Sequence, residues 1–223
     1  SRSLIIATGA EAIWLGAEGE DEVKGKGVST CATCDGAFYE GKEAIVGGGD
    51  SAMEESLFLT KFASKVTLVH RRTGFRASKI MLERVQDHPK IEMKLNRVVK
   101  RRVQRRGVLA GAALEDPRGD EGCGSKVEDF LPCSGAFLSI GHKPMTKFLR
   151  SLDAAGTNRD EAMAIELDED GFILHKDHTM TSVEGVFACG DVVDRRYRQA
   201  ISAAGMGCQA AIDCERWLAG NVQ

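Results

Sequence analysis

Hydrophobic residues in this chain gather in short continuous runs that end in glycine or in charged residues. Unbroken runs of this kind are typical of strands that are buried on both faces of a parallel sheet. The sequence predicts such strands at Leu4–Ala7, Glu43–Gly47, Val66–His70, Phe137–Ile140 and Gly185–Cys189. Amphipathic or small-residue patterns predict helices at Asp50–Ser64, Ser78–Gln86 and Gln199–Leu218. Three further runs are predicted to be strands of a meander: Ile91–Leu95, Val98–Val103 and Val108–Leu114. Two charged or glycine-containing stretches are predicted to be loops: Glu18–Lys26 and Pro117–Ser125. The pattern indicates an α/β protein.

A glycine-rich run joins the strand at Glu43–Gly47 to the helix that follows, and it reads Gly47-Gly48-Gly49-Asp50-Ser51-Ala52. Strand, glycine loop, helix and strand form the βαβ unit that a dinucleotide-binding fingerprint requires. In this interpretation Gly47 permits the turn, Gly49 lets a pyrophosphate approach the backbone, and the small Ala52 allows close packing of helix and strand. A glycine-rich turn that binds no ligand is the alternative. The surrounding βαβ pattern favours the nucleotide site.

The end of the second strand of this unit indicates which nucleotide binds. Sites for NAD place an acidic residue there, which accepts a hydrogen bond from the ribose 2′-hydroxyl. This chain has His70-Arg71-Arg72 instead, followed by Arg76. Guanidinium groups bind phosphate through paired, charge-assisted hydrogen bonds. We therefore predict NADP(H), with a solvated basic loop as the alternative interpretation.

Two cysteines spaced C-x-x-C precede the glycine run, in the order Cys31-Ala32-Thr33-Cys34-Asp35. This spacing permits a small reversible disulfide, and Asp35 places a proton donor and acceptor beside the sulfurs. Half of a structural zinc site is the alternative, but it requires two more ligands in a second paired motif. The histidines are scattered, and no such pair occurs among the other cysteines, which are Cys123, Cys133, Cys189, Cys208 and Cys214. The pattern favours a redox dithiol and predicts no metal site.

Composition narrows the function further. The 223 residues carry a net charge of −3 and contain no run long enough for a transmembrane helix or a secretory signal. A basic run at Lys100–Arg106 lacks interleaved aromatic residues, so we interpret it as a solvated hairpin and expect no nucleic-acid or membrane partner. Seven irregularly spaced cysteines favour a reducing compartment, most simply the cytoplasm. The chain lacks an initiator Met, so either a tag has been removed or the chain begins within a longer protein.

Two further segments bear on the site. The strand Phe137–Ile140 and the turn after it, at Gly141, are interpreted as a crossing between domains. Asp191 follows a buried strand and precedes a helix, and this position is equally consistent with a helix cap and with a ligand-binding role.

Seven motifs of the chain, taken in order, resemble those of the low-molecular-weight, flavin-dependent thioredoxin reductases. They are Ile6-Ala7-Thr8-Gly9-Ala10, Cys31-Ala32-Thr33-Cys34-Asp35-Gly36, Gly47–Ala52, His70-Arg71-Arg72 with Phe75-Arg76, Ile140-Gly141-His142 with Pro144, Gly190-Asp191, and Tyr197-Arg198-Gln199-Ala200. The resemblance covers essentially the whole chain. It implies a Rossmann-like NADPH-binding domain, residues 13–141, inserted into an incomplete FAD-binding domain of similar topology. Residues 1–12 and 142–223 then belong to the two FAD segments.

The resemblance also implies roles for individual residues. Cys31 and Cys34 form the redox disulfide with Asp35 as the acid/base, and the arginines bind the 2′-phosphate. The nucleotide-binding set is Gly47, Gly49, Asp50, Ser51, Ala52, His70, Arg71, Arg72, Arg76, Ile140 and Gly141. The FAD-binding set is Gly190, Asp191, Arg198, Gln199 and Ala200, with Asp191 near the ribityl–pyrophosphate region and the last three near the flavin ring.

The chain departs from the family pattern at two places. Asp50-Ser51 replaces a commoner Asn-Thr pair, which places a negative charge near the pyrophosphate that is tolerable if Asp50 caps the helix. The family's first glycine fingerprint, expected well upstream of Ile6, is absent, so the chain resembles the C-terminal two-thirds of a reductase.

The function implied by the resemblance is electron transfer from NADPH, through FAD and the Cys31–Cys34 disulfide, to thioredoxin or a thioredoxin-like protein. The complete protein is expected to form a homodimer and to rotate one domain about hinges near Ala12 and Gly141–His142. Two alternatives remain at this stage: an NADPH-binding module without turnover, and the reductase subunit of a peroxidase system. For these 223 residues alone we expect NADPH binding, little retained FAD and negligible reduction of thioredoxin.

Overall fold

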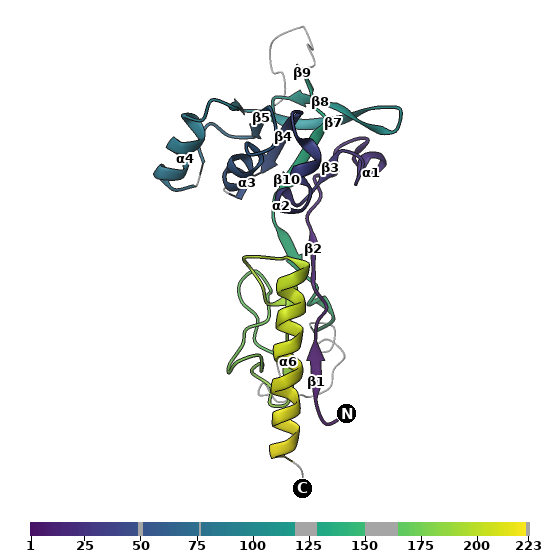
Figure 1. Cartoon of the computed structure of the whole chain (residues 1–223), viewed down its shortest axis with the longest axis vertical. Helices are drawn as coiled ribbons and strands as arrows, with labels where there is room; N and C mark the ends of the chain where they lie inside the picture. The colour runs from purple at the N-terminus through teal and green to yellow at the C-terminus, as the bar shows by residue number, and fades with distance from the viewer. Residues whose placement is uncertain (49–50, 76, 119–128, 150–164, 222–223) are drawn as a thin grey trace. The chain divides into compact units, whose positions relative to one another are not determined.

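The computed structural model describes residues 1–48, 51–75, 77–118, 129–149 and 165–221. The chain forms two compact units (Figure 1). The first consists of Ser1–Ala12 together with His142–Gln223, and we call it the split unit. The second consists of Ile13–Gly141, and we call it the inserted unit.

The inserted unit is built on a five-stranded sheet in which every pairing is parallel, with the strand order β3-β10-β4-β5-β6. In that order the strands are β3 (Val28–Ser29), β10 (Gly135–Ser139), β4 (Glu43–Gly48), β5 (Lys65–His70) and β6 (Ile91–Leu95). The predicted α/β fold class is confirmed, because strands and helices alternate along this part of the chain.

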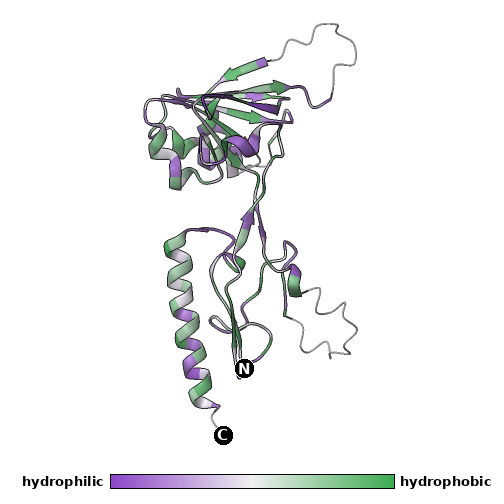
Figure 2. Ribbon diagram, turned by 90° about the vertical axis from the view of Figure 1, so that its right-hand side faces the viewer, coloured by the Kyte–Doolittle hydropathy of each residue, from purple (hydrophilic) through white to green (hydrophobic). Residues whose placement is uncertain are grey.

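Both faces of this sheet are buried, because successive residues of each strand point to opposite sides. On β4, Ala44 and Val46 pack into one core cluster and Ile45 into another. On β10, Phe137 belongs to the first cluster and Ala136 and Leu138 to the second. This double burial explains the unbroken apolar runs of the sequence, and the sheet is coloured predominantly hydrophobic in Figure 2.

Helices cover the first face. Helix α3 (Ser51–Leu59) buries Met53 and Leu59 against β4 and β5, and helix α4 (Lys79–Gln86) begins at Ser78, whose hydroxyl accepts a hydrogen bond from Met81 N. Helix α3 is shorter than the predicted helix, because a turn closes after it and Ser64 N donates to Lys42 O. Short helices flank the sheet at α1 (Glu20–Val23), α2 (Ala32–Asp35) and the 3-10 helix η1 (Gly36–Tyr39). The predicted loop at residues 18–26 therefore contains α1, whose Val23 is fully buried.

A three-stranded antiparallel sheet covers the second face. It is made of β7 (Val98–Arg105), β8 (Val108–Glu115) and β9 (Asp129–Pro132) in that order. Its inward residues, such as Leu109, Leu114 and Leu131, pack into the core cluster on that face. The prediction that residues 91–95 belong to this meander is wrong: β6 pairs with β5 in the parallel sheet, and β9 takes the third position.

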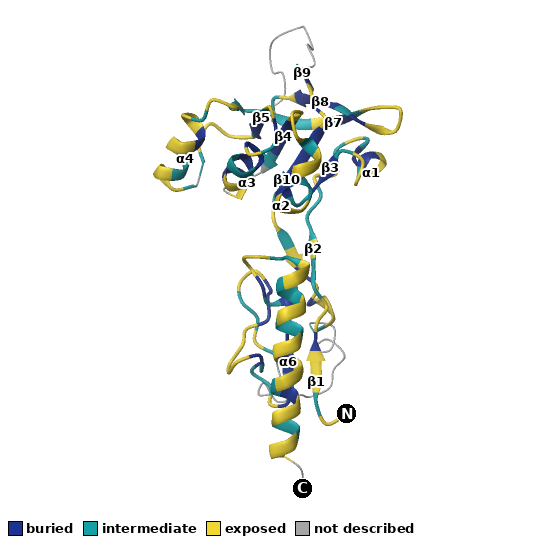
Figure 3. Cartoon of the chain, in the orientation of Figure 1, coloured by how far each residue is buried: buried dark blue, intermediate teal, exposed yellow. Residues whose placement is uncertain are grey.

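The split unit contains two small sheets and one long helix. β1 (Leu4–Ile6) pairs in parallel with β12 (Val186–Ala188), and β2 (Ala10–Ala12) pairs antiparallel with β11 (His142–Pro144). A 3-10 helix, η3 (Gly190–Val192), follows β12, and α6 (Ala200–Gly220) packs on β12 through its buried residues Ala210 and Cys214. Most of α6 is exposed (Figure 3).

The prediction of a buried first strand at Leu4–Ala7 is wrong for three of its four residues, because Leu4, Ile5 and Ala7 are exposed. Only Ile6 of β1 is buried, whereas Leu4 is 52% exposed and Ile5 is 38% exposed. β12 is the one strand that pairs with β1 in the described part of the chain, so one edge of β1 is uncovered there. Among the described residues, no helix is long and apolar enough to cross a membrane.

Gly185 and Gly205 form a matched pair for testing the packing of α6. Gly185 has φ +75°, and a Cβ at this position would lie 2.7 Å from the Trp217 ring, whereas a Cβ at Gly205 in α6 meets no heavy atom within 4 Å. We expect Gly185→Ala to destabilise the split unit by about 2–3 kcal/mol, from the left-handed conformation and the clash. Gly205→Ala is expected to stabilise it by about 0.5–1 kcal/mol, because alanine is the better helix former. Denaturant unfolding followed by circular dichroism measures both, and equal effects of the two variants would contradict this account of the packing.

Candidate functional site

A cavity of about 470 Å³ opens in the inserted unit at the carboxyl ends of β5, β4 and β10. Its walls come from the ends of these strands, from the loop after β5, and from β7 with the residue before it. The lining residues are Leu15, Ile45, Val46, Gly47, Val69, His70, Arg71, Arg72, Gly74, Arg97, Val98, Val99, Arg102, Leu138 and Ile140. This is the edge at which open parallel sheets bind ligands.

Gly47 leaves open space at the centre of this edge. It lies within β4, paired with Val69 and Leu138, so it does not form the turn that the sequence analysis assigned to it. A Cβ at Gly47 would meet no heavy atom within 4 Å. The missing side chain therefore widens the cavity where a pyrophosphate would approach the strand end.

The basic residues after β5 line the same cavity. Arg71 and Arg72 are exposed there, on the loop that follows His70. His70 shapes this loop, because its ring stacks on Phe75 with a centroid distance of 4.2 Å and its Nε2 lies 3.1 Å from Gly74 O.

The remaining predicted nucleotide-binding residues occupy several positions. Ala52 is fully buried in the first turn of α3, beside the exposed Ser51. Ile140 lines the cavity, whereas Gly141 is not among the lining residues. Gly141 has φ +101°, and its carbonyl oxygen accepts a hydrogen bond from Ile13 N. The other three predicted residues lie outside the described ranges: Gly49, Asp50 and Arg76.

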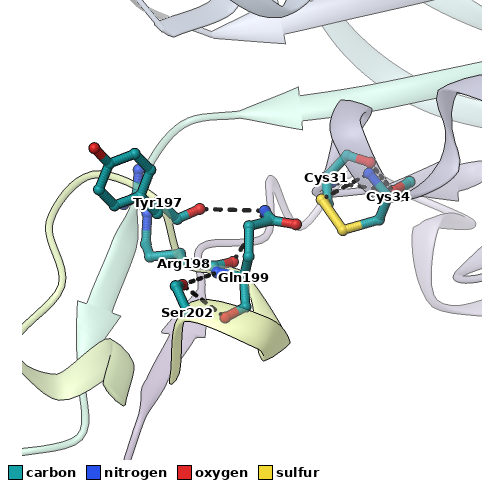
Figure 4. The surroundings of a disulfide bond; sticks show 7 residues. Cys31, Cys34, Tyr197, Arg198, Gln199 and Ser202 are labelled. Carbon is teal, nitrogen blue, oxygen red and sulfur yellow. Dashed lines mark hydrogen bonds between the residues drawn. A yellow bond between two sulfur atoms is a disulfide. The ribbon is translucent and has the colours of Figure 1, made fainter. Parts of the chain in front are cut away.

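Cys31 and Cys34 are joined by a disulfide at the start of α2 (Figure 4). Cys31 is the N-cap residue, and its sulfur accepts a hydrogen bond of 3.1 Å from Cys34 N. Ser29, at the end of β3, fixes the preceding backbone, because its hydroxyl accepts from Cys31 N at 3.0 Å. Cys34 is exposed, so the bond is accessible from solvent. Sequence reasoning missed Ser29, although a hydroxyl residue two positions before a turn is typical of this local bond.

Asp35 closes α2 directly after the disulfide. Its carboxylate is close enough to Tyr39 to raise the pKa of that phenol, after the larger effect of burial. Tyr39 in turn packs edge-on against Phe137 of β10, with ring centroids 5.2 Å apart. The segment that carries the disulfide is thus anchored to the central sheet.

In the split unit, Asp191 and His142 are half-buried and interact electrostatically with each other. Asp191 Oδ1 and His142 Nδ1 are buried and have no hydrogen-bond partner among the described residues. Burial, and then the charge of Asp194, raises the pKa of Asp191, while burial and Arg198 lower the pKa of His142. The described hydrogen bonds give no capping role to Asp191, so its free oxygen fits a donor on a ligand.

Asp194 orders the turn between η3 and α6, and sequence reasoning missed it. Its carboxylate accepts hydrogen bonds from the backbone N–H groups of Arg196, Tyr197 and Arg198, at 2.8–2.9 Å. These bonds hold Arg198 at φ +48°, a conformation that is unfavourable for a long side chain. Burial alone would raise the pKa of Asp194, but these hydrogen bonds outweigh burial and lower it. An aspartate two to four residues before such amides is the signal that identifies this turn.

Gln199 and Ala200 follow this turn at the start of α6. Gln199 and Ser202 form a reciprocal capping box, in which Gln199 N donates to Ser202 Oγ at 3.3 Å (Figure 4). Ala200 is exposed. Gly190 has φ +75°, a conformation that favours glycine, and a Cβ there would lie 3.7 Å from Ala203 Cβ of α6, an ordinary contact distance.

Comparison with known families matches this chain to the pyridine nucleotide-disulphide oxidoreductases. The model of that family matches residues 1–207, and the chain belongs to this family. Within it, the similar proteins are thioredoxin reductases, which confirms the resemblance found in the sequence. The bifunctional thioredoxin reductase/thioredoxin of Mycobacterium leprae is 47% identical over 98% of this chain and 44% of its own length. The thioredoxin reductase of Mycolicibacterium smegmatis is 46% identical over 98% of this chain and 65% of its own length.

Solved structures agree with this assignment. The thioredoxin reductase from Giardia duodenalis superimposes with a TM-score of 0.81 and 39% identity, over 97% of this chain and 66% of its own. The chain thus spans about half to two-thirds of the length of these relatives.

Differences in thiol reactivity test the cysteine assignment. Cys133 is 6% exposed, and burial raises the pKa of its thiol to about 12, so that at pH 8 only about one thiol in ten thousand is ionised. Cys208 is exposed on α6. In the native oxidised protein at pH 8 we expect iodoacetamide to alkylate Cys208, to spare Cys133, and to reach Cys31 and Cys34 only after dithiothreitol is added. Peptide mass mapping measures the labels, and labelling of Cys31 without reductant would contradict the disulfide.

Proposed function

We propose that this chain carries the NADPH-binding site and the redox disulfide of a thioredoxin-disulfide reductase. The observation that carries the proposal is the shared location of two features in the inserted unit. A cavity lined by Gly47, Arg71 and Arg72 opens at the carboxyl end of the parallel sheet, and an accessible Cys31–Cys34 disulfide lies in the same compact unit. The first feature suits a phosphorylated dinucleotide and the second suits thiol–disulfide exchange.

The residues present fit NADPH. Arg71 and Arg72 would hold the 2′-phosphate through charge-assisted hydrogen bonds, and the open space at Gly47 would admit the pyrophosphate. The described residues of the FAD-binding set also fit FAD, because Asp191 within η3 presents a buried oxygen, Oδ1, that has no hydrogen-bond partner among the described residues. When bound, the nicotinamide and the flavin supply the hydride chemistry.

The protein's own contribution to the reaction lies at the disulfide. Reduction of the Cys31–Cys34 bond adds two electrons and two protons and gives two thiols. One thiolate then attacks a partner disulfide to form a mixed disulfide, and the second thiol resolves it, which leaves the partner reduced and restores the Cys31–Cys34 bond. We assign to Asp35 the transfer of protons to and from these sulfurs. Thioredoxin or a thioredoxin-like protein is the proposed partner, and a homodimer the proposed assembly of the complete protein.

Nucleotide preference tests the first half of the proposal. Because Arg71 and Arg72 would bind the 2′-phosphate, we expect NADPH to bind at least tenfold more tightly than NADH. Arg71→Ala/Arg72→Ala is expected to abolish most of that preference and to leave NADH binding nearly unchanged. Isothermal titration calorimetry with both nucleotides measures the two affinities.

A charge-matched control variant separates the loss of contacts to the 2′-phosphate from the change in the net charge of the protein. Arg105→Ala/Arg106→Ala removes the same two charges from the exposed β7–β8 turn, outside the cavity. This variant is expected to retain the preference for NADPH. Equal affinity of the unmodified protein for both nucleotides would refute the assignment.

Trapping of a mixed disulfide tests the second half without a flavin. The substrate is a thioredoxin with a single active-site cysteine, activated as its thionitrobenzoate disulfide. The Cys31→Ser variant retains the exposed Cys34 and is expected to displace thionitrobenzoate and form a covalent complex. The Cys31→Ser/Cys34→Ser variant is the control and should form none above the level due to Cys208. Absorbance of the released thionitrobenzoate and non-reducing electrophoresis measure the exchange. Absence of a complex with Cys31→Ser, and also with Cys34→Ser, would contradict the proposed exchange.

A further inference from the structure

Arg102 of β7 is a buried arginine on the wall of the nucleotide cavity. Its side chain is 1% exposed, whereas Arg71 and Arg72 on the same cavity are exposed. Two of its guanidinium nitrogens, Nε and Nη1, are buried without a hydrogen-bond partner among the described residues. A buried guanidinium with unmade hydrogen bonds is costly for folding, so its retention requires a compensating interaction.

The protein itself compensates this charge only in part. Among the described residues it forms an ion pair with Glu20 in α1, whose Oε2 lies 3.9 Å from Arg102 Nη2, beyond hydrogen-bonding distance. Glu20 Oε2 is also without a hydrogen-bond partner, while Oε1 accepts from Gly16 N at 3.0 Å. Burial lowers the pKa of Arg102, and the charge of Glu20 offsets part of this shift.

We propose that Arg102 is a further nucleotide-binding residue, whose buried guanidinium faces the pyrophosphate of the bound dinucleotide. This inference rests on the proposed function and adds to it a cation that belongs to none of the predicted phosphate motifs. Phosphate oxygens supply the acceptors that Nε and Nη1 lack, and a guanidinium is suited to them by charge and geometry.

The course of β7 indicates that Arg102 would face the pyrophosphate and not the 2′-phosphate. Next to its start, Arg97 N donates to His70 O, beside the loop that carries Arg71 and Arg72. Five residues later, Arg102 N donates to Glu18 O, beside α1. At about 3.3 Å per residue, the two ends of this stretch lie on the order of 15 Å apart. Arg102 therefore lies at a distance from the proposed 2′-phosphate site, and the remaining anionic group of a dinucleotide is the pyrophosphate.

Three variants test the proposal by calorimetric titration with NADPH and with NADH, the latter to millimolar concentration. Arg102→Met removes the charge and keeps the length of the side chain. We expect it to weaken both nucleotides by about tenfold and to leave the ratio of their affinities unchanged, because the pyrophosphate is common to both. Glu20→Gln keeps the acceptor for Gly16 N but removes the opposing charge. It is expected to strengthen the binding of both nucleotides several-fold.

The double variant Glu20→Gln/Arg102→Met controls for folding. It replaces the buried pair by neutral groups of similar size, so its thermal midpoint should equal or exceed that of the unmodified protein, while its nucleotide affinity should match that of Arg102→Met. A purely structural ion pair would move the melting temperature of the single variants and leave the affinity of the double variant unchanged.

Each outcome decides between the two proposals. Affinities within twofold of the unmodified protein in the double variant would overturn the role of Arg102 and leave the NADPH site intact. Weaker binding in Glu20→Gln than in the unmodified protein would also overturn it. Failure of the unmodified protein to bind NADPH would refute the proposed function, and the role of Arg102 with it.

Discussion

The parallel pairing of β4 with β5 and with β10 is the constraint on which the rest of the inserted unit depends. Parallel strands need crossover connections, and these connections cover both faces of the sheet with helices on one side and an antiparallel sheet on the other. The carboxyl ends of all three strands then meet at one edge. Because both faces are filled, this edge is the place where a cavity can open without removing core contacts, and Gly47, His70 and Ile140 all line it.

Several segments that carry functional side chains are held by local contacts that the sheet itself does not supply. Ser29 fixes the backbone of Cys31, and the stacking of His70 on Phe75 shapes the loop of Arg71. In the split unit Asp194 performs the same task for the turn before α6 by accepting three backbone N–H groups. A site built in this way needs few long-range contacts to keep its geometry, since the bonds span no more than about five residues.

Sequence reasoning was successful where structure follows from contiguous residues. The β4–α3–β5 unit was predicted because its apolar runs, glycines and helix lie within one short segment, and the Cys31–Cys34 disulfide because its spacing is itself the signal. It failed where position depends on distant partners. Residues 91–95 have the same strand pattern whichever sheet they join, and the pattern does not specify that β5 is their neighbour.

Arg102 illustrates the same limit for the site. In the sequence it belongs to a basic run, Lys100–Arg106, that was interpreted as a solvated hairpin. The interpretation holds for Arg105 and Arg106, which are exposed, but not for Arg102, which the twist and bulges of β7 turn inward toward α1. Charge alone does not reveal burial; only the pairing of β7 with β8 and the position of Glu20 do so.

Because Arg102 is buried whereas Arg71 and Arg72 are exposed, these arginines differ in how they would contribute to nucleotide binding at the proposed site. Arg71 and Arg72 are exposed, so dissolved salt screens their attraction for a phosphate. Arg102 is enclosed by protein, where a charge interacts more strongly and is screened much less. The exposed pair therefore contributes a salt-dependent preference for NADPH over NADH, because only NADPH carries the 2′-phosphate. The buried cation suits affinity for the dinucleotide as a class, because NADPH and NADH both carry the pyrophosphate. On this argument, rising ionic strength reduces the preference for NADPH more than it reduces the part of the affinity that depends on Arg102.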